Sequence, residues 1–456
     1  MSLDISRLKY LIKSDLKIEL LVPEVHPMIV LSNHIPWDQM SDVVIPDLYE
    51  NKKMSGRKLN IRLHLGAFIL QSQYKWTDRV LEDMIRFHGP TMLFCGLENS
   101  NQGLDHSQYT RFRNRISEES AKNLSTIIVQ TAMSHGFTDS TFMDFDSTVQ
   151  EANICYPSDI SMLRKLAQKS EKILDFLIEK GVIAAVDIKE KLDFRKIGKE
   201  IKGYFFTKKS KKGKEEKRLL LEEITNEVNT VIENVLSLSS IVDETGLPWN
   251  YEKDWEEVTI KGSHLLSDIR YFLKNQKIKA GKILSLGRDM VTCIRKGKAG
   301  KLNEFGRIWF VAKIKGNYTF GFSPKDEVRQ SDSESFDIGL DQFNEIFSTS
   351  PESVSADQGF WSDHNIASCI LSEVKEIGIH PRGNLSWLVN DEEVERLTNR
   401  RASVEGAIGN LKKRGMGKSK MKSDEATFLE GQRSFLSMNL SRFTKDLILR
   451  EVQPDF

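Results

Sequence analysis

Apolar residues at helical spacing dominate the first hundred residues of the chain. The stretches 57–71 and 75–89 each carry an apolar stripe, which predicts an amphipathic helix. Thr77 stands where an N-cap is expected in the second of them. A further helix is expected from Pro36, because proline suits the first helical turn. Together these patterns predict a compact helical module with short turns over residues 31–98.

A helix-turn-helix unit is one interpretation of this module. Its surface would carry four basic side chains, Arg57, Lys58, Arg62 and Arg79. Helix pairs of this kind also occur in ordinary bundles, so the pattern alone equally fits a module that never touches DNA.

Strand-like alternation begins at residues 141–150, TFMDFDSTVQ. Phe142, Asp144 and Asp146 fall on one face, and the residues between them fall on the other. Phenylalanine and threonine favour strands. Two acids on one strand face require either an edge that faces water or a site at the end of the strand.

Residues 159–290 show long helical periodicity, and we expect an antiparallel helical insertion there. A charge run, KKSKKGKEEKR at 208–218, interrupts the helices. Such runs are usually solvated loops, with contact to phosphate as the alternative.

Strand character returns at 305–322, where the KGN sequence at 315–317 signals a hairpin turn. A short helix, a short strand that ends at Asp357, a helix, a short strand and a final helix from about residue 391 follow. With the strand at 141–148 placed in front, this order predicts a mixed sheet flanked by helices.

Residues 400–422 comprise the later part of this final helix and the basic segment that follows it. The apolar stripe of the helix is formed by Val404, Ile408 and Leu411. Arg401, Glu405 and Lys412 share a neighbouring stripe, since each residue turns the helix by about 100°. Glu405 is thus a single acid among cations. It either forms an ordinary i,i+4 ion pair with Arg401 or holds a metal ion where a polyanion binds.

Two glycines, Gly406 and Gly409, lower the helix propensity of this segment by roughly 1 kcal/mol each relative to alanine. We expect them to allow a close approach to another element. After the helix we expect a basic tail.

Composition narrows the setting but not the function. The chain has 456 residues, enough for two or three domains, and its net charge of +1 gives no argument for a polyanionic partner. The four cysteines are far apart, which predicts neither a zinc ribbon nor a disulfide framework. The N-terminus resembles no signal peptide, and no apolar run reaches the ~18 residues of a membrane span. We expect a reducing, cytoplasmic location and no membrane partner.

Three carboxylates fall at positions that suit a metal site. Asp146 and Asp357 end predicted strands, and Glu405 lies on the helix that follows. Converging acids need cations, and two Mg²⁺ ions about 3.5–4 Å apart would supply them. Each acid alone is equally well explained as a cap, a turn residue or a member of a surface pair.

Several stretches together resemble the DDE transposases of bacterial insertion sequences. Residues 33–97 are similar to the N-terminal domain of one large group of them, and DSTVQEANICYPSD (146–159) is similar to the segment after the first catalytic acid. IRKGKAGKLNEFG (294–306) and SADQGFWSDHN (355–365) are similar to the hairpin and second-acid regions. RASVEGAIGNLKKRGMGKSKMK (401–422), followed by MNL (438–440), resembles the third-acid helix.

The resemblance implies a mixed, helix-rich α/β fold whose ribonuclease-H-like sheet is flanked by helices. It implies a helical DNA-binding domain (1–125), a catalytic domain (126–159 and 290–456) and a helical insertion (160–289). Asp146 would bridge two Mg²⁺ ions, for which Mn²⁺ would substitute, while Asp357 and Glu405 would each hold one. The implied DNA contacts are Arg400, Arg401, Lys412, Lys413, Arg414, Lys418 and Lys420.

The activity that the resemblance implies is binding of terminal inverted repeats, cleavage at the ends of the element and strand transfer into target DNA. Because two ends must be joined, the resemblance also implies a homodimer in the synaptic complex. It implies a location in the bacterial cytoplasm, at the nucleoid. The alternatives are a catalytically inactive or repurposed DNA-binding protein and a nuclease that acts on RNA–DNA hybrids.

The sequence departs from the family pattern at two places. Thr398 occupies a position where relatives often have tyrosine, which puts its contribution to positioning DNA ends in doubt. The helical insertion comes directly after the first strand, whereas many relatives with an insertion carry it before the last helix; here it would be a scaffold or a DNA clamp. Asp144, on the same strand face as Asp146, is a rival for the first acid.

Overall fold

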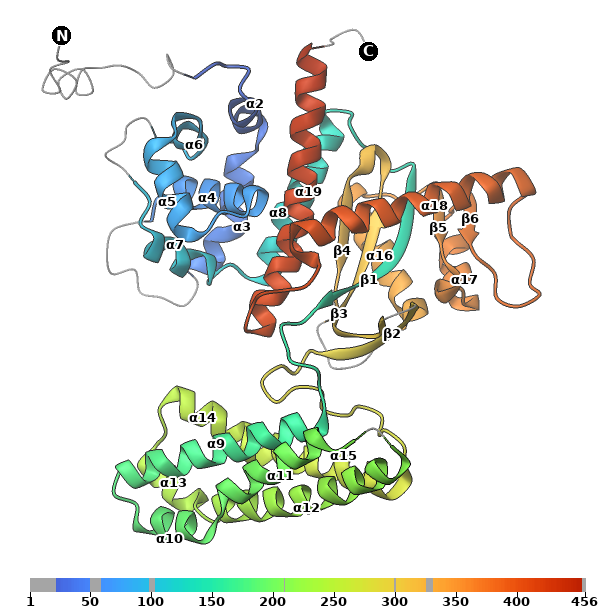
Figure 1. The fold of residues 1–456 in the computed structure, drawn as a ribbon. Helices are drawn as coiled ribbons and strands as arrows, with labels where there is room; N and C mark the ends of the chain where they lie inside the picture. Colours follow the sequence, from blue (N-terminus) through green and yellow to red (C-terminus); the bar gives the residue numbers. More distant parts are fainter. Residues whose placement is uncertain are drawn as a thin grey trace, which may run out of the picture. The chain divides into compact units, whose positions relative to one another are not determined.

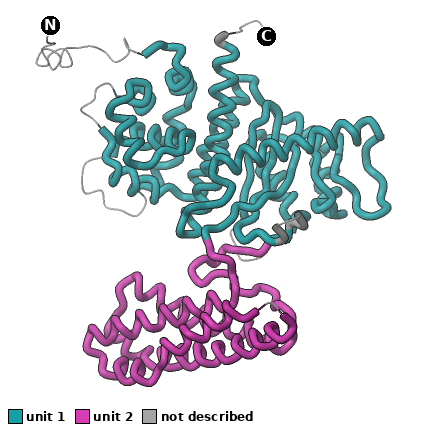
Figure 2. The backbone as a smooth tube through the Cα atoms, in the orientation of Figure 1, with its two compact units in different colours: residues 1–153, 294–456 teal, residues 154–293 magenta. Residues whose placement is uncertain are grey.

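The structure, a computed structural model, describes residues 22–49, 59–97, 103–208, 210–298, 301–324 and 331–452. The chain forms two compact units, one made of residues 1–153 and 294–456 and the other of residues 154–293 (Figure 2). The residues predicted as a helical insertion, 160–289, fall within the second unit.

The first unit begins with a helical module. Its described helices are α2 (Pro27–His34), α3 (Trp37–Tyr49), α4 (Ile61–Tyr74), α5 (Asp78–Phe87), α6 (Gly89–Phe94), α7 (His106–Arg113) and α8 (Glu118–Ser134). The predicted cap at Thr77 is confirmed, because its side chain accepts a hydrogen bond from the Val80 N–H at 3.3 Å. Asn60 caps α4 in the same way through the Leu63 N–H.

Arg62 does not belong to a DNA-binding surface of this module, contrary to the prediction. Its guanidinium lies over the Trp37 ring, 3.1 Å from the centroid, and donates a hydrogen bond to the Phe94 carbonyl at 2.5 Å. Burial lowers the pKa of Arg62 to about 10. The side chain therefore ties α4 to α3 and α6. Arg79 is exposed, while Arg57 and Lys58 lie outside the described residues.

A mixed sheet forms the other part of the first unit, as predicted (Figure 1). Its strands are β1 (Phe142–Glu151), β2 (Thr292–Lys298), β3 (Lys301–Lys313), β4 (Thr319–Phe322), β5 (Ser353–Ala356) and β6 (Glu376–Ile379). The order is β2-β3-β1-β5-β6, with β4 also paired to β3. β1 pairs antiparallel with β3, and β1, β5 and β6 run parallel. The hairpin turn falls at Lys315–Asn317, as predicted, and Gly316 supplies its positive φ of 74°.

The two faces of the sheet are covered by different helices, which are α16 (Asp332–Phe347), α17 (Asp363–Leu371), α18 (Asp391–Leu411) and α19 (Asp424–Val452). Alternation along β3 divides them: Phe310 packs in the core that includes α16, and Val311 packs with residues of α18 and α19. The core on the α16 side is continuous with the helical module. α18 crosses the sheet, in contact with β1, β3, β5 and β6 (Figure 1).

The second unit is helical and has a hydrophobic core of its own. Its helices are α9 (Asp159–Glu179), α10 (Ile183–Lys191), α11 (Phe194–Phe206), α12 (Lys211–Leu236), α13 (Ser239–Thr245), α14 (Trp249–Glu256), a π-helical turn (Glu257–Lys261) and α15 (Gly262–Asn275). The loop prediction for residues 208–218 is wrong over most of its length. α12 begins at Lys211, because the Ser210 side chain accepts a hydrogen bond from the Gly213 N–H and caps the helix.

Within the described part of the chain, every helix is too short or too polar to cross a membrane.

Candidate active site at the sheet edge

Asp146 and Asp357 occupy equivalent places on neighbouring parallel strands. The register of β1 and β5 pairs Phe145 with Ala356, and each aspartate is the next residue in its strand direction. Neighbouring strands lie about 4.8 Å apart, so the register places the backbones of the two aspartates next to each other. Both residues are half-buried.

Asp144, the rival for the first acid, is engaged inside the protein. Its side chain is fully buried, and its Oδ1 accepts hydrogen bonds from Ser355 Oγ at 2.6 Å and from Arg400 Nε at 2.7 Å. Burial raises the pKa of Asp144, against the opposing effect of Arg400, Ser355 and Lys313. This arrangement assigns Asp144 to holding α18 against the sheet. Asp146 does not end its strand, contrary to the prediction: β1 continues to Glu151, and only the pairing with β5 stops before Asp146.

Asp357 is fixed by the turn that follows β5. Its Oδ1 accepts a hydrogen bond from the Gly359 N–H at 2.8 Å. A Cβ at Gly359 would lie 2.8 Å from Asp332 Oδ2 and 3.0 Å from Asp357 Oδ1, so two carboxyl groups border this glycine. One of them, Asp332, lies at the start of α16, and no sequence pattern predicts that it lies near Asp357.

Glu405 lies on the flank of α18. The buried stripe of the helix is formed by Leu397, Val404, Ala407 and Leu411. On one flank, Ser403 Oγ accepts a hydrogen bond from Lys313 Nζ at 2.8 Å, and Lys313 pairs with Asp144 in the sheet. Glu405 follows two residues later, about 200° around the helix. It therefore lies on the opposite flank, which faces away from Lys313, and it is exposed.

The bridge between Arg401 and Glu405 is not formed: in the described ranges, the ion pairs of α18 are those of Arg396 with Glu376 and Arg400 with Asp144. The close-approach role predicted for Gly406 and Gly409 is also wrong. A Cβ at either position would meet nothing within 4 Å, because both residues lie on the solvent side of the helix.

The three acids do not form a closed metal site. Among the residues that the structure describes, no three His, Cys, Asp or Glu side chains are grouped so that they could hold a metal ion. Asp146 and Asp357 offer the carboxylate oxygens that Mg²⁺ prefers, and Oδ1 of each already accepts a backbone hydrogen bond, from the Ser147 N–H at 2.7 Å and from the Gly359 N–H at 2.8 Å. The pair fits a metal site, and Glu405 stands apart from it in this conformation.

Two of the basic residues predicted to contact DNA have partners inside the protein. Arg400 donates to Asp144 and, through Nη2, to Ser353 Oγ at 2.9 Å. Arg414 donates to Ser437 Oγ at 2.8 Å, and burial lowers its pKa. Arg401 and Lys412 are half-buried, and the exposed members of the set are Lys413, Lys418 and Lys420.

The basic segment after α18 is anchored and is not a loose tail. It begins with a π-helical turn, Lys412–Met416. The Glu151 N–H then donates to the Gly417 carbonyl at 3.0 Å, and the Ser419 N–H donates to the Glu151 carbonyl at 2.8 Å. The cations of this segment are thereby fixed against the end of β1.

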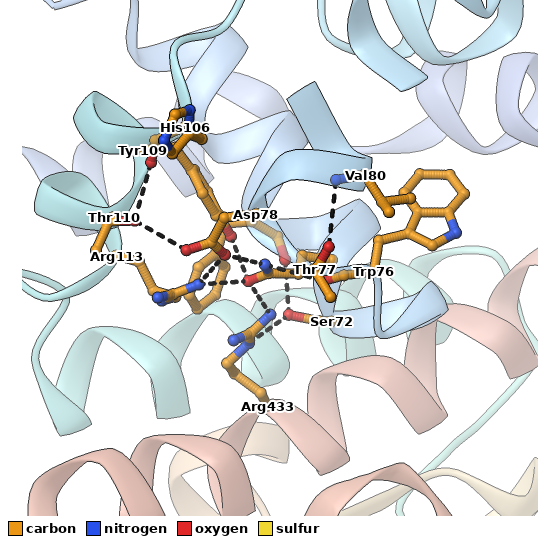
Figure 3. Close-up of polar contacts among 12 residues, drawn as sticks. Ser72, Trp76, Thr77, Asp78, Val80, His106, Tyr109, Thr110, Arg113 and Arg433 are labelled. Atoms are coloured by element: carbon orange, nitrogen blue, oxygen red, sulfur yellow. Dashed lines mark hydrogen bonds and ion pairs between the residues drawn. The ribbon is translucent and has the colours of Figure 1, made fainter. Parts of the chain in front are cut away.

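A buried polar network joins the helical module to α19 (Figure 3). Arg433, on α19, donates to Gln71 Oε1 at 3.0 Å and to Ser72 Oγ at 2.9 Å. Gln71 in turn donates to Asp78 Oδ1 at 2.6 Å. Although burial opposes the shift, hydrogen bonds from Arg113, Gln71 and Thr110 lower the pKa of Asp78. The sequence reasoning missed Arg433, which carries no motif.

Residues 16–115 match the family described as Transposase domain (DUF772), a span that ends at the α7–α8 linker and does not reach the sheet. No curated protein and no solved structure matches the chain. The match supports a transposase-family protein.

Proposed function

We propose that this protein is a DNA transposase that cleaves phosphodiester bonds at the ends of its element and joins the freed 3′-hydroxyl groups to target DNA. The observation that carries the proposal is the position of Asp146 and Asp357, one residue beyond the paired Phe145 and Ala356 on parallel strands. The match of residues 16–115 to a transposase domain family supports DNA as the substrate on which these two acids act.

The architecture supports a ribonuclease-H-like catalytic domain. The sheet has an antiparallel part around β3 and a parallel part formed by β1, β5 and β6. Helices cover both of its faces, and α18, the helix that carries Glu405, contacts β1 and β5. This arrangement is compatible with the insertion-sequence transposases that the sequence resembles.

The residues that would hold two Mg²⁺ ions, or Mn²⁺ in their place, are Asp146, Asp357 and Glu405. When bound, the metals would activate the attacking water or 3′-hydroxyl and stabilise the leaving oxygen. Glu405 is exposed and has no ion pair with Arg401. Its side chain is therefore available to join the other two acids when DNA binds.

The basic residues of α18 and of the segment behind it would hold the DNA backbone. Arg401 and Lys412 lie on the same flank of the helix as Glu405, and cations there would neutralise phosphates near the scissile bond. Lys413, Lys418 and Lys420 would extend this track. Arg400 and Arg414 are left out, because their guanidinium groups bind Asp144 and Ser437.

A cleavage assay tests the proposal. The full chain is mixed with duplex DNA from the borders of its coding region, and Mg²⁺ or Mn²⁺ is added. Asp146→Asn, Asp357→Asn and Glu405→Gln should each lower cleavage by about 100-fold or more, a loss typical of removing one transition-state stabiliser, and should still bind the DNA. Asp363→Asn, at an exposed aspartate on α17, is the matched control.

Each contrary result selects another function. Variants that cleave as well as the parent would exclude these acids as catalytic residues. A parent that binds border DNA but never cuts it with either metal would be a non-catalytic DNA-binding protein. Preferential cutting of RNA–DNA hybrids would identify a nuclease of that class. A dimer that joins two ends belongs to the same proposal, and sedimentation of the protein with border DNA measures it.

A further inference from the structure

A large cleft separates the helical module from the basic segment behind α18. Its volume is about 1250 Å³. One wall is formed by the α4–α5 linker, with Lys75 and Trp76, and by the α7–α8 linker, with Arg115. The other wall is formed by the segment from Lys412 to Ser423 and by the first turns of α19. Two parts of the chain that are distant in sequence thus border one cavity.

The cleft carries an excess of positive charge. Eight of its lining residues are Lys or Arg and five are Asp or Glu. Two of the acids are engaged: Asp78 pairs with Arg113, and Glu430 accepts a hydrogen bond from Ser419 Oγ at 2.7 Å. The excess lies on the wall formed by the basic segment and α19, where five cations face Glu425 and Glu430, whereas on the module wall Lys75, Arg113 and Arg115 are balanced by Asp78, Glu118 and Glu119.

Several of these cations are free to bind an anion. Lys75, Arg115, Lys413, Lys418 and Lys420 are exposed, and no ion pair involving them occurs within the described residues. Like charges that share a cavity repel one another, so an anion that enters the cleft would relieve the repulsion among the lysines of the basic segment, while Lys75 and Arg115 offer it contacts from the opposite wall.

An aromatic residue in the lining of the cleft favours nucleic acid over an acidic peptide. Trp76 lines the cleft and stacks on Tyr74, with ring centroids 4.7 Å apart and an interplanar angle of 13°. Tyr74 is 42% exposed. Tyr74 does not itself line the cleft and Trp76 is half-buried, so a nucleic-acid base would stack on the accessible part of the Trp76 ring, whereas an acidic peptide needs only the charges.

The two walls are held in a fixed relation. Arg433 is buried and binds Gln71 and Ser72, which joins α19 to α4. On the other side, Ser419 and Gly417 are hydrogen-bonded to Glu151 at the end of β1. Because neither wall must be ordered when the ligand binds, the spacing of the cations is set in advance.

We propose that this cleft binds one phosphodiester strand of the DNA end, which Lys75 and Arg115 contact from the helical module while Lys413, Lys418 and Lys420 contact it from the opposite wall. The choice of DNA as the ligand rests on the proposed function. Lys412 lines the cleft and shares the Glu405 flank of α18. A strand held in the cleft therefore continues toward the candidate acids.

Binding measurements on the full chain test this inference. The probes are a labelled duplex of the border DNA and a duplex of scrambled sequence, titrated at several salt concentrations. Lys75→Gln and Arg115→Gln should each weaken binding about 3- to 10-fold. Each should also lower the slope of log K against log salt by about one. Lys375→Gln is the matched control, because Lys375 is an exposed lysine before β6, outside the cleft.

Circular dichroism melts verify that each variant is folded. Variants that keep the parent's affinity and salt slope would overturn the inference, and so would poly-glutamate that competes as well as DNA of equal charge. The two proposals fail separately. If the parent cleaves DNA and neither Lys75→Gln nor Arg115→Gln changes binding, the proposal of DNA binding in the cleft fails and the proposed transposase activity stands. If the parent never cleaves DNA but both variants lose DNA binding, the proposal of DNA binding in the cleft stands and the catalytic proposal fails.

Discussion

Arg400 donates its Nε–H to Oδ1 of Asp144 across 2.7 Å, although 256 positions separate the two residues in the sequence. Asp144 is fully buried in β1, and Arg400 belongs to the helix that carries Glu405. The same guanidinium reaches Ser353 of β5 and lies over the Phe142 ring, 4.3 Å from the centroid. The ion pair thus fixes α18 on the two strands that bear Asp146 and Asp357.

Replacing Arg400 should destabilise the sheet-bearing unit. Arg400→Ala leaves Asp144 buried without its cation, which typically costs about 3–5 kcal/mol. Arg401→Ala, at the half-buried neighbour without an ion pair, should cost about 1 kcal/mol or less. Urea denaturation of both variants, followed by tryptophan fluorescence, measures the difference. Equal losses would mean that the pair does not hold the helix.

The pH dependence of that loss follows from the pKa of Asp144. Burial already raises this pKa in the presence of Arg400, and removal of the cation raises it further. The folded state of Arg400→Ala then binds more protons than the unfolded chain at pH values between the two pKa values, so its stability falls as pH rises. We expect a smaller deficit relative to the parent at pH 5 than at pH 7.

Much of this arrangement was predictable from local patterns. The alternation TFMDFDSTVQ predicts β1, and the turn signal at 315–317 predicts the hairpin. The partner of Asp144 was not predictable, because two acids on one strand face are equally compatible with either one being buried. Only the packing of α18 decides that Arg400 meets Asp144 and not Asp146.

Asparagine substitutions at Asp144 and Asp146 should affect different properties, the first stability and the second DNA cleavage. Asp144→Asn removes the charge that binds Arg400 and should lower the melting temperature of the sheet-bearing unit. Asp146→Asn should leave the melting temperature within about 2 °C of the parent, since half-exposed substitutions usually cost less than about 0.5 kcal/mol, while border-DNA cleavage is lost. Calorimetry and the cleavage assay on both variants check the pair. Loss of cleavage in a stable Asp144→Asn variant would reverse the assignment.

Two glycine substitutions test where close packing occurs. A Cβ at Gly431 on α19 would lie 2.2 Å from Cζ2 of the fully buried Trp309. Gly431→Ala should therefore cost about 1–3 kcal/mol, as expected for overpacking. Gly409→Ala meets open space on α18 and should stabilise that helix by roughly 1 kcal/mol through its propensity. Chemical denaturation of both variants measures the contrast. If Gly409→Ala destabilises the protein, the close approach predicted from the sequence would be supported after all.

The candidate site was harder to predict than the fold because its parts meet only in three dimensions. Asp357 at the end of a short strand was visible in the sequence, but its register with Asp146 depends on which strands pair. The basic segment 412–420 was visible as charge alone. Its opposite wall, with Lys75 and Arg115, lies in another part of the sequence and carries no motif, so the cleft could be found only from the packed structure.

DNA affinity should fall as pH rises from 7 to 9, because Lys75 loses its proton in that range. Part of Lys75 is exposed to solvent. Desolvation by the surrounding protein, together with Arg433 and Arg414 and against the opposing charge of Glu430, nevertheless lowers the pKa of Lys75 to about 8. The folded pKa thus lies below the unfolded value of about 10.4, so without DNA the protein gains stability as pH rises from 8 to 10.4. DNA phosphate favours the protonated form, and at pH 9, one unit above this pKa, the affinity should be lower by up to about tenfold. Fluorescence anisotropy with border DNA at constant ionic strength measures this profile. Lys75→Arg keeps its charge throughout and should give a flatter profile, and Lys75→Gln should be equally flat but weaker. A parent and a Lys75→Arg variant with the same pH profile would show that another group titrates, and Lys75 would then have no part in binding the strand.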